Sequence, residues 1–291
     1  MNINEIKKIK KIRQIKQRPA ESHKGDFGHV LIIAGSKPMA GAAVLCTRAA
    51  LKSGAGLVTM AVPEPIYPIT ATSCVEAMSL PLPATVQGML HESALHVLLD
   101  FIRKKNITSI VMGPGLGREI QTRMVIIGII NNCDCRGVLD ADALNQLAGN
   151  IGILKHSPGQ WIITPHPGEL SRMVERPIAD IQRKRKYYAV QAARQTGSVC
   201  ILKGHRSIIT DGKKTMINTT GNPGMATGGS GDVLAGIVGG LLAQDIKPFE
   251  AACWGSYVHG RAGDCAARMM TQPGMIAGDI IEYIPAAFKK A

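Results

Sequence analysis

Residues 219–232 read Thr-Thr-Gly-Asn-Pro-Gly-Met-Ala-Thr-Gly-Gly-Ser-Gly-Asp, and an apolar run at residues 233–242 follows them directly. Five glycines within residues 221–231 would be costly inside a regular helix or strand. Just before a helix, however, they let backbone N–H groups approach an anion, and the helix start adds about half a positive charge. The segment therefore predicts a phosphate-binding loop. It is not a GxxxxGK[ST] loop, a motif that occurs nowhere in the sequence.

Asp232 ends this loop. A carboxylate is electrostatically unfavourable beside phosphates unless it has a function there. Held next to a substrate hydroxyl, it can accept the proton as the oxygen attacks a terminal phosphate. The alternative is an aspartate that only caps the helix. The surrounding glycines, which a cap does not need, favour Asp232 as a catalytic base.

Short apolar runs alternate with helical segments along the rest of the chain, and polar or glycine-rich turns follow most of them. We expect strands within residues 29–36, 57–62, 109–112, 137–140, 161–164 and 199–202, a hairpin at 207–210 and 215–218, and helices at 39–53, 91–104 and 233–242. The proline-rich residues 64–90 are expected to be irregular. This order predicts an α/β fold with a central, mostly parallel sheet and helices on both faces. Ligands bind such sheets beyond the carboxyl ends of the strands.

The formal charge of +13 is unevenly distributed. Residues 1–18 hold seven lysines and arginines against one glutamate, and residues 183–186 add four more cations. We interpret residues 1–20 as a solvated basic arm and residues 21–291 as one nucleotide-binding catalytic domain. A basic nucleic-acid-binding protein is the alternative, with binding that weakens steeply as salt rises. The mildly basic remainder of the chain favours no nucleic-acid partner.

Composition also indicates where the protein works. Apolar residues make up 45% of the chain and charged residues 19%, which predicts a large folded core. The longest apolar run, at residues 233–243, is too short to span a bilayer. The seven cysteines have no metal-binding spacing and are interpreted as reduced thiols. The N-terminus lacks the apolar stretch of a signal peptide. We therefore expect a cytoplasmic protein with no membrane partner.

The stretch Gly229-Ser230-Gly231-Asp232 before an apolar helix resembles the C-terminal signature of the ribokinase-like superfamily. Five further segments narrow the resemblance: Gly-His-Val-Leu-Ile-Ile-Ala-Gly-Ser at 28–36, Gly-Ala-Ala at 41–43, Gly-Pro-Gly-Leu-Gly at 113–117, Asp-Ala-Asp-Ala at 140–143 and Thr-Pro-His-Pro-Gly-Glu at 164–169. In this order, over about residues 25–287, they resemble the ADP/ATP-dependent NAD(P)H-hydrate dehydratases.

The resemblance implies an enzyme of nicotinamide cofactor repair. It would phosphorylate the ring hydroxyl of the S epimer of hydrated NADH or NADPH, with ADP or ATP as donor and Mg²⁺ as cofactor. Loss of phosphate would then restore the reduced nicotinamide. A homotetramer is also implied, and a separate NAD(P)H-hydrate epimerase is a possible partner, because this sequence leaves no room for the epimerase domain sometimes fused to such enzymes. The alternative is a ribokinase-like vitamin or thiazole kinase, whose product keeps its phosphate.

The resemblance also assigns residues to the site. It makes Asp232 the catalytic base and a substrate contact, together with Ala42, Gly115, Gly117 and His166. The expected nucleotide-binding residues are Lys203, Gly204, His205, Arg206, Ser207, Gly228, Gly229, Ser230 and Gly231. Ser207 stands where the family usually has threonine. Asp140 and Asp142 are candidate magnesium ligands, acting through water. Plain helix packing is the alternative for Ala42, a surface position for Lys203 and an ordered turn for His166, while Glu169 is expected to begin the next helix.

Overall fold

A ten-stranded sheet forms the centre of the molecule in the computed structural model, which describes residues 7–8 and 18–289. Its strand order is β1-β10-β9-β8-β7-β6-β5-β2-β3-β4. Only the β8–β9 and β9–β10 pairs are antiparallel. The strands are β1 Lys7–Lys8, β2 His29–Ile33, β3 Leu57–Pro63, β4 Met78–Leu82, β5 Ser109–Met112, β6 Arg136–Leu139, β7 Gln160–Ile163, β8 Val199–Leu202, β9 Ile208–Thr210 and β10 Thr215–Ile217.

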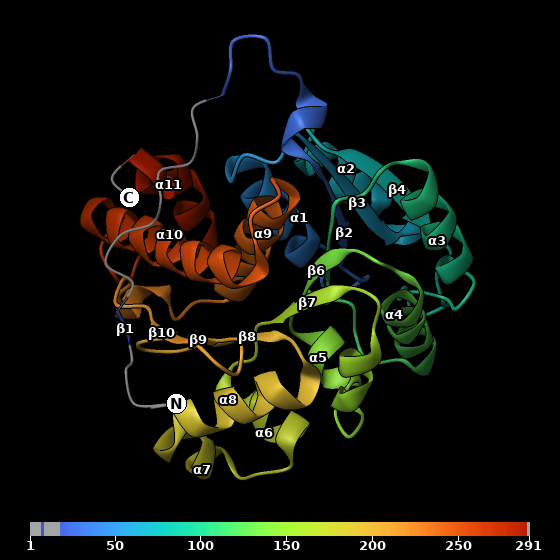
Figure 1. Ribbon diagram of the computed structural model, residues 1–291. Coiled ribbons are helices and arrows are strands. Elements are labelled where there is room, and N and C mark those ends of the chain that lie inside the picture. Colours follow the sequence, from blue (N-terminus) through green and yellow to red (C-terminus); the bar gives the residue numbers. More distant parts are fainter. Residues whose placement is uncertain (1–6, 9–17, 290–291) are drawn as a thin grey trace.

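Helices cover both faces of this sheet (Figure 1). One face carries α1 Ala40–Lys52, α2 Tyr67–Ser73, α9 Ser230–Ala243, α10 Pro248–Met269 and α11 Ala277–Lys289. The other carries α3 Ala94–Lys104, α4 Ile120–Asn132, α5 Asp142–Gln146, α6 Pro167–Val174, α7 Ile178–Arg183 and α8 Arg185–Thr196. The predicted α/β architecture, with a mostly parallel sheet between two helical layers, is confirmed.

The side chains of β2 show why its sequence is apolar throughout. Val30 and Ile32 belong to the core shared with α1, α9, α10 and α11, whereas Leu31 and Ile33 belong to the core on the opposite face. All four are fully buried. Successive side chains of a strand point to opposite faces, so a strand buried on both sides has an uninterrupted apolar sequence.

Helix α9 packs unusually close to its neighbours because of its glycines. A Cβ at Gly236 would collide with the backbone carbonyl of Cys46 in α1, and one at Gly239 would collide with Val111 in β5. Nearly every residue of α9 after its first turn is buried. Glycine lowers helix propensity by about 1 kcal/mol per residue. In α9 the glycines allow the helix to pack closely against α1 and the sheet, which offsets this cost. The close packing fixes the position of the helix N-terminus.

The prediction for residues 64–90 is wrong. This segment contains α2 and the edge strand β4, which pairs in parallel with β3. Its prolines are placed where they do little harm. Pro68 lies in the first turn of α2, where its missing N–H would have no helical acceptor. Pro81 lies in β4, which has a neighbour on one side only.

Only part of the predicted basic arm is described. Lys7–Lys8 pair in parallel with β10. Arg18 is attached to the body of the domain, because its guanidinium donates to the carbonyl of Gly54 at 2.7 Å and lies 3.8 Å from the ring centre of Phe27. Residues 1–6 and 9–17 lie outside the described residues, so the solvated arm stays a prediction.

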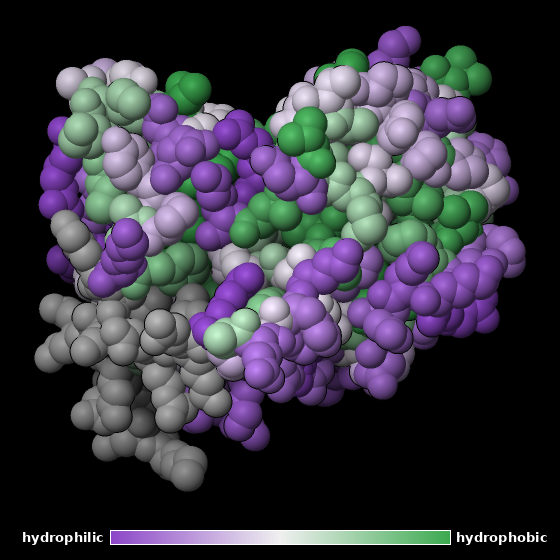
Figure 2. Space-filling view, turned by 90° about the horizontal axis from the view of Figure 1, so that it is seen from above, coloured by the Kyte–Doolittle hydropathy of each residue, from purple (hydrophilic) through white to green (hydrophobic). Residues whose placement is uncertain are grey.

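The described helices include none that combines the length and the apolarity needed to cross a membrane. Figure 2 shows hydrophilic and hydrophobic residues mixed on one face of the molecule, with apolar residues gathered near its middle.

Candidate functional site

The chain reverses direction in the sheet next to β2. It runs from β2 outward to β3 and β4, and then returns to β5 on the other side of β2. Such a switch point leaves a crevice beyond the carboxyl ends of the two strands. There the backbone N–H of Gly35 donates to the carbonyl of Pro114 at 2.8 Å. Gly115, with φ of +64°, approaches α1 so closely that a Cβ would lie 2.9 Å from that of Ala42. The structure thus brings two of the predicted substrate residues together.

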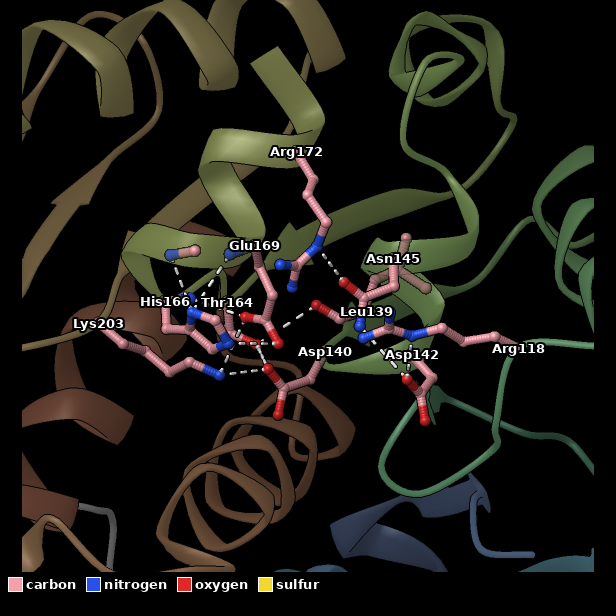
Figure 3. A network of polar contacts seen from close by, with 11 residues as sticks. Arg118, Leu139, Asp140, Asp142, Asn145, Thr164, His166, Glu169, Arg172 and Lys203 are labelled. Carbon is pink, nitrogen blue, oxygen red and sulfur yellow. Dashed lines mark hydrogen bonds and ion pairs between the residues drawn. The ribbon is translucent and has the colours of Figure 1, made fainter. Parts of the chain in front are cut away.

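Asp140 is the central carboxylate of a polar cluster at the carboxyl ends of β6, β7 and β8. It follows β6 and is 1% exposed. Its Oδ1 accepts hydrogen bonds from the Lys203 ammonium and from the Thr164 hydroxyl, both at 2.7 Å. Lys203 also lies 3.6 Å from Oε2 of Glu169, which is buried as well. Residues from the ends of three neighbouring strands therefore share one ion-pair cluster (Figure 3).

Lys203 is not the surface lysine that the alternative interpretation described. Burial opposes its positive charge, but attraction to Asp140 and Glu169 outweighs burial and raises the pKa of the ammonium. The lysine is therefore charged at neutral pH and partly balances the two carboxylates. A buried carboxylate without such a partner would cost several kcal/mol, on the order of the penalty known for uncompensated buried charges.

The same cluster lies against the N-terminus of α9. A Cβ built on Gly231 would be 3.3 Å from the Lys203 Nζ and 3.6 Å from Oδ2 of Asp140. That Oδ2 is buried and, among the described residues, has no hydrogen-bond partner. Because position 231 has no side chain, both an ammonium and an unpartnered carboxylate oxygen lie close to the backbone at the N-terminus of the helix.

The first turn of α9 has the properties of an anion site. The N-cap is Gly229, with φ of +85°. The N–H of Ser230 donates to Thr227 and that of Val233 to Gly229, but within the described chain the N–H groups of Gly231 and Asp232 have no backbone acceptor. Unpaired N–H groups and the helix dipole both favour a bound anion. The prediction of a phosphate-binding loop before this helix is compatible with this geometry.

His259 of α10 lies behind the same turn. Its Nε2 is 3.3 Å from the hydroxyl oxygen of Ser230. Burial lowers the pKa of His259 to about 4, so the imidazole is neutral near pH 7. A neutral partner can orient the Ser230 hydroxyl without adding a charge to the site.

Asp232 lies partly buried in the first turn of α9. Burial and repulsion from Asp140 raise the pKa of its carboxyl to about 7, although Lys203 acts in the opposite direction. A carboxyl that titrates near neutral pH is ionised often enough to accept a proton and basic enough to hold it. These are the properties required of the predicted catalytic base.

His166 and Glu169 form a capping box at the start of α6. Nδ1 of His166 accepts from the N–H groups of Gly168 at 3.0 Å and Glu169 at 3.2 Å, while the His166 N–H donates to Oε2 of Glu169 at 2.7 Å. Because Nδ1 accepts, the neutral ring carries its proton on Nε2, which lies 3.3 Å from Oε1 of Glu169. Burial lowers the pKa of His166. Glu169 begins α6 as expected, and it also pairs with Lys203, which the sequence did not indicate.

Asp142 has different partners from Asp140. Its Oδ2 accepts from the N–H of Gly117 at 2.9 Å, and its Oδ1 lies 3.3 Å from both Nε of Arg118 and Nδ2 of Asn145. Within residues 7–8 and 18–289, His, Cys, Asp and Glu side chains form no group of three or more that could hold a metal ion. The pairing of Asp140 with Asp142 as magnesium ligands therefore stays a prediction, and Asp142 is the weaker candidate.

The predicted nucleotide-binding turn follows β8. Gly204, His205 and Arg206 are exposed, and the Ser207 hydroxyl donates to the carbonyl of Gly204 at 2.9 Å. Lys203 differs from the rest of the turn, since its side chain points into the carboxylate cluster (Figure 3). The turn is therefore accessible to a nucleotide, and its first residue reaches the anion site of α9.

Helix α10 holds the glycine-rich loop in a way that the sequence did not reveal. Asp264 accepts from the N–H of Gly221 at 3.1 Å and from the side chain of Asn222 at 3.2 Å. A Cβ on Gly260 would collide with Thr220. Small residues one helical turn apart beside an aspartate, as at positions 260, 263 and 264, are the signal that could have indicated this contact.

The second basic cluster borders the predicted nucleotide-binding turn, because the Arg185 guanidinium donates to the carbonyls of Leu202 at 3.3 Å and Lys203 at 3.2 Å. Arg183 ends α7 and Arg185 begins α8. They help to line a cavity of about 520 Å³ that contains none of the predicted site residues. Its other lining residues are Lys184, Lys186, Tyr187, Val190, Gln191 and Arg194.

Comparisons of this sequence with known proteins all point to the same family. A family model described as NAD(P)H-hydrate dehydratase matches residues 30–286. A bifunctional NAD(P)H-hydrate repair enzyme of Moorella thermoacetica is 44% identical over 271 residues, which are 92% of this chain and 51% of the relative. An ADP-dependent (S)-NAD(P)H-hydrate dehydratase of Neisseria meningitidis is 34% identical over 270 residues, which are 91% of this chain and 86% of the relative. The chain spans about half the length of the curated bifunctional relatives that it matches.

Solved structures agree with the fold. The ADP/ATP-dependent NAD(P)H-hydrate dehydratase of Bacillus subtilis, co-crystallised with ATP and Mg²⁺, superposes with a TM-score of 0.82 at 29% identity, covering 95% of this chain and 94% of that one. A ribokinase-like superfamily protein from Enterococcus faecalis superposes with a TM-score of 0.81 at 30% identity, covering 95% and 92%. The predicted ribokinase-like fold is therefore confirmed.

Proposed function

This chain belongs to the NAD(P)H-hydrate dehydratase family, and we propose that it dehydrates the S epimer of hydrated NADH or NADPH with ADP or ATP as phosphoryl donor. The observation that carries the proposal is the first turn of α9. There Asp232, whose pKa is raised to about 7, lies in the same turn as two backbone N–H groups that have no backbone acceptor among the described residues, and close to the Lys203 ammonium. A base beside an anion site is what phosphoryl transfer to a hydroxyl requires.

The first step uses this arrangement directly. The substrate hydroxyl oxygen attacks the terminal phosphorus of the donor, the bond from phosphorus to the leaving oxygen breaks, and Asp232 accepts the hydroxyl proton. The N–H groups of Gly231 and Asp232, which have no backbone acceptor among the described residues, would hold phosphate oxygens. Lys203, charged at neutral pH, adds attraction on the side of the strand ends. Preorganised donors of this kind stabilise the transition state because they need no reorientation during the reaction.

The second step needs little from the protein. The lone pair of the ring nitrogen expels phosphate from the ring carbon bonded to it, and the next ring carbon then loses a proton to water or to the released phosphate, which restores the double bond. Phosphorylation makes this possible because hydroxide is a poor leaving group and phosphate a good one. We propose that Ala42, Gly115, Gly117 and His166 surround the dinucleotide during both steps. The contact of Gly115 with Ala42 and the polar cluster around His166 support a site at this crevice.

The residues present fit a magnesium ion that arrives with the nucleotide. Mg²⁺ in nucleotide enzymes keeps several waters and needs only one or two protein carboxylates besides phosphate oxygens. The unpartnered Oδ2 of Asp140 beside Gly231 is the oxygen best placed to hold it, directly or through water. Bound magnesium would neutralise phosphate charge.

One assay tests the proposed function. The protein is incubated with hydrated NADH, MgCl₂ and either ADP or ATP, and both the absorbance of reduced nicotinamide and free phosphate are followed. Equal, donor-dependent recovery of NADH and phosphate supports the dehydratase. A stable phosphorylated product without NADH recovery would instead indicate a small-molecule kinase. The same comparison decides between ADP and ATP.

Three further properties stay predictions. A homotetramer is tested by light scattering during size-exclusion chromatography, and a separate epimerase partner by acceleration of the turnover of a mixed R and S hydrate when epimerase is added. A cytoplasmic location is tested by fractionation of the source cells.

A further inference from the structure

Two arginines, Arg118 and Arg172, flank the short helix α5 and are joined by one hydrogen-bonded chain (Figure 3). Nε of Arg118 lies 3.3 Å from Oδ1 of Asp142. The same oxygen accepts from Nδ2 of Asn145 at 3.3 Å, and Oδ1 of Asn145 accepts from Nε of Arg172 at 2.9 Å. The chain thus connects the loop after β5, the start of α5 and the helix α6.

Within residues 7–8 and 18–289, each guanidinium is held through its Nε alone. Among the described residues, the terminal nitrogens of Arg118 and Arg172 have no hydrogen-bond partner. Both side chains are exposed, that of Arg118 by 60%. A guanidinium fixed at Nε presents its remaining N–H groups as a planar fork, which matches two oxygens of a phosphate group. The anchoring also reduces the entropy lost when the fork binds an anion.

Asp142 does not cancel this cationic pair. Its two oxygens are already shared between the Gly117 N–H, the Asn145 amide and Arg118. Its role in the chain is therefore to orient Arg118 and to carry the link to Arg172. The hydrogen-bonded group thus contains two cations, Arg118 and Arg172, and one carboxylate. Its exposed surface therefore favours a ligand with more than one negative charge.

The position of the pair indicates which part of the substrate it meets. Arg118 directly follows Gly117, and Arg172 lies one helical turn after Glu169 in α6, the helix that His166 caps. The pair is therefore next to the predicted substrate residues. The first turn of α9 lies against Asp140 instead, because a Cβ on Gly231 would be 3.6 Å from Oδ2 of that residue. A nicotinamide dinucleotide carries two adjoining phosphates between its two nucleosides.

We infer that Arg118 and Arg172, oriented through Asp142 and Asn145, bind the pyrophosphate of the dinucleotide hydrate. The inference rests on the proposed function for the identity of the substrate. It makes the two arginines binding residues that place the nicotinamide ring, and it gives them no part in proton transfer or in holding the phosphoryl donor.

The test compares substrates with and without phosphate. The variants are Arg118→Gln, Arg172→Gln and the double variant, with Arg103→Gln as a matched control. Arg103 is also an exposed arginine paired with an aspartate, but it lies in the last turn of α3, before the amino end of β5. The two substrates are hydrated NADH and hydrated reduced nicotinamide riboside, which has the same ring and no phosphate.

For hydrated NADH, we expect KM to rise about tenfold in each single variant and by on the order of 100-fold in the double variant, with kcat changed less than about threefold. The KM of the nucleotide donor and the kcat/KM of the riboside substrate should stay within about twofold of the unsubstituted enzyme in every variant. Equal losses with both substrates, or a rise in the donor KM in place of the hydrate KM, would overturn the inference.

Equilibrium binding separates this inference from the proposed function. NADH itself carries the pyrophosphate and needs no turnover, so its dissociation constant is measured by fluorescence for the unsubstituted protein and the double variant. We expect at least tenfold weaker binding in the double variant and unchanged binding of reduced nicotinamide riboside. If the dehydration assay fails but this difference is found, the subsite stands and the proposed reaction does not. Equal NADH binding by the two proteins contradicts the subsite even if dehydration is observed.

Discussion

Replacing Asp232 with asparagine should make the folded protein more stable at alkaline pH, because the native structure holds this carboxyl in an unfavourable environment. The pKa of the group is raised from 3.8 to about 7, first by burial and then by repulsion from Asp140. Each tenfold change in an ionisation constant corresponds to about 1.4 kcal/mol, so ionising Asp232 in the folded state costs up to about 4 kcal/mol. Asparagine is nearly the same size and carries no such cost.

The sign follows from proton binding. Between pH 3.8 and about 7 the folded protein holds the Asp232 proton more tightly than the unfolded chain does, so a rise in pH removes stability. The stability advantage of Asp232→Asn should therefore be small below pH 4 and grow as pH rises towards 8. Between pH 5 and pH 8 alone, the difference in free energy of unfolding should widen by up to about 2–3 kcal/mol. Because water has partial access to the carboxyl and screens its charge, we expect a difference in the lower half of this range.

Urea unfolding at pH 5, 6, 7 and 8 measures this difference. Asp134→Asn, the same chemical change at an exposed loop position, is the matched control. A difference between Asp232→Asn and the unsubstituted protein that stays constant with pH, or narrows as pH rises, would refute the reasoning. A destabilised active-site carboxylate would also be a concrete case of stability lost in favour of activity.

Three other perturbations test the remaining parts of the site. The kcat/KM of dehydration should rise with pH and level off above about pH 7, because only ionised Asp232 accepts a proton. Initial rates measured from pH 5 to pH 9 test this prediction. A kcat/KM that falls through that range would contradict it. Lys203→Met should lower the free energy of unfolding by about 3–5 kcal/mol at pH 7, since Asp140 and Glu169 lose their buried cation. In urea unfolding, this loss of stability should be smaller below pH 4, where the carboxylates are protonated. An equal loss at both pH values would show that the lysine stabilises the fold by packing and not by its charge. Gly231→Ala should lower kcat at least tenfold, because the new methyl group lies at the anion site. The melting temperature should stay the same or rise, because alanine favours a helix more than glycine does. Full activity of this variant would exclude the first turn of α9 from phosphate binding.

The sequence indicates elements more reliably than it indicates what they bring together. The six predicted strands, the hairpin and α9 follow from apolar runs and glycine-rich turns, and each lies where expected within a few residues. The two edge strands, β1 and β4, are not among them. The expectation of irregular structure at residues 64–90 is wrong because proline does not exclude a helix or a strand at every position. Its position at an edge strand or in a first helical turn depends on neighbours that the local sequence does not contain.

The candidate site shows the same division. The glycine-rich loop and Asp232 are contiguous, so their chemistry is visible in fourteen residues. The ion pair of Lys203 with Asp140 joins positions 63 residues apart and depends on the order β6-β7-β8 in the sheet. The support of the loop by Asp264 depends on how α10 packs against it. The spacing of residues in the sequence does not predict such contacts. A predicted parallel sheet indicates only that the carboxyl ends of its strands lie at one edge, not which side chains pair there.

The most direct test of the account is the single-turnover rate of Asp232→Asn with saturating hydrated NADH, magnesium and nucleotide, measured beside the nucleotide dissociation constant. The proposed role predicts a rate at least about 100-fold below that of the unsubstituted enzyme, with nucleotide bound about equally well. An unchanged rate would show that the carboxylate at the start of α9 is not the proton acceptor.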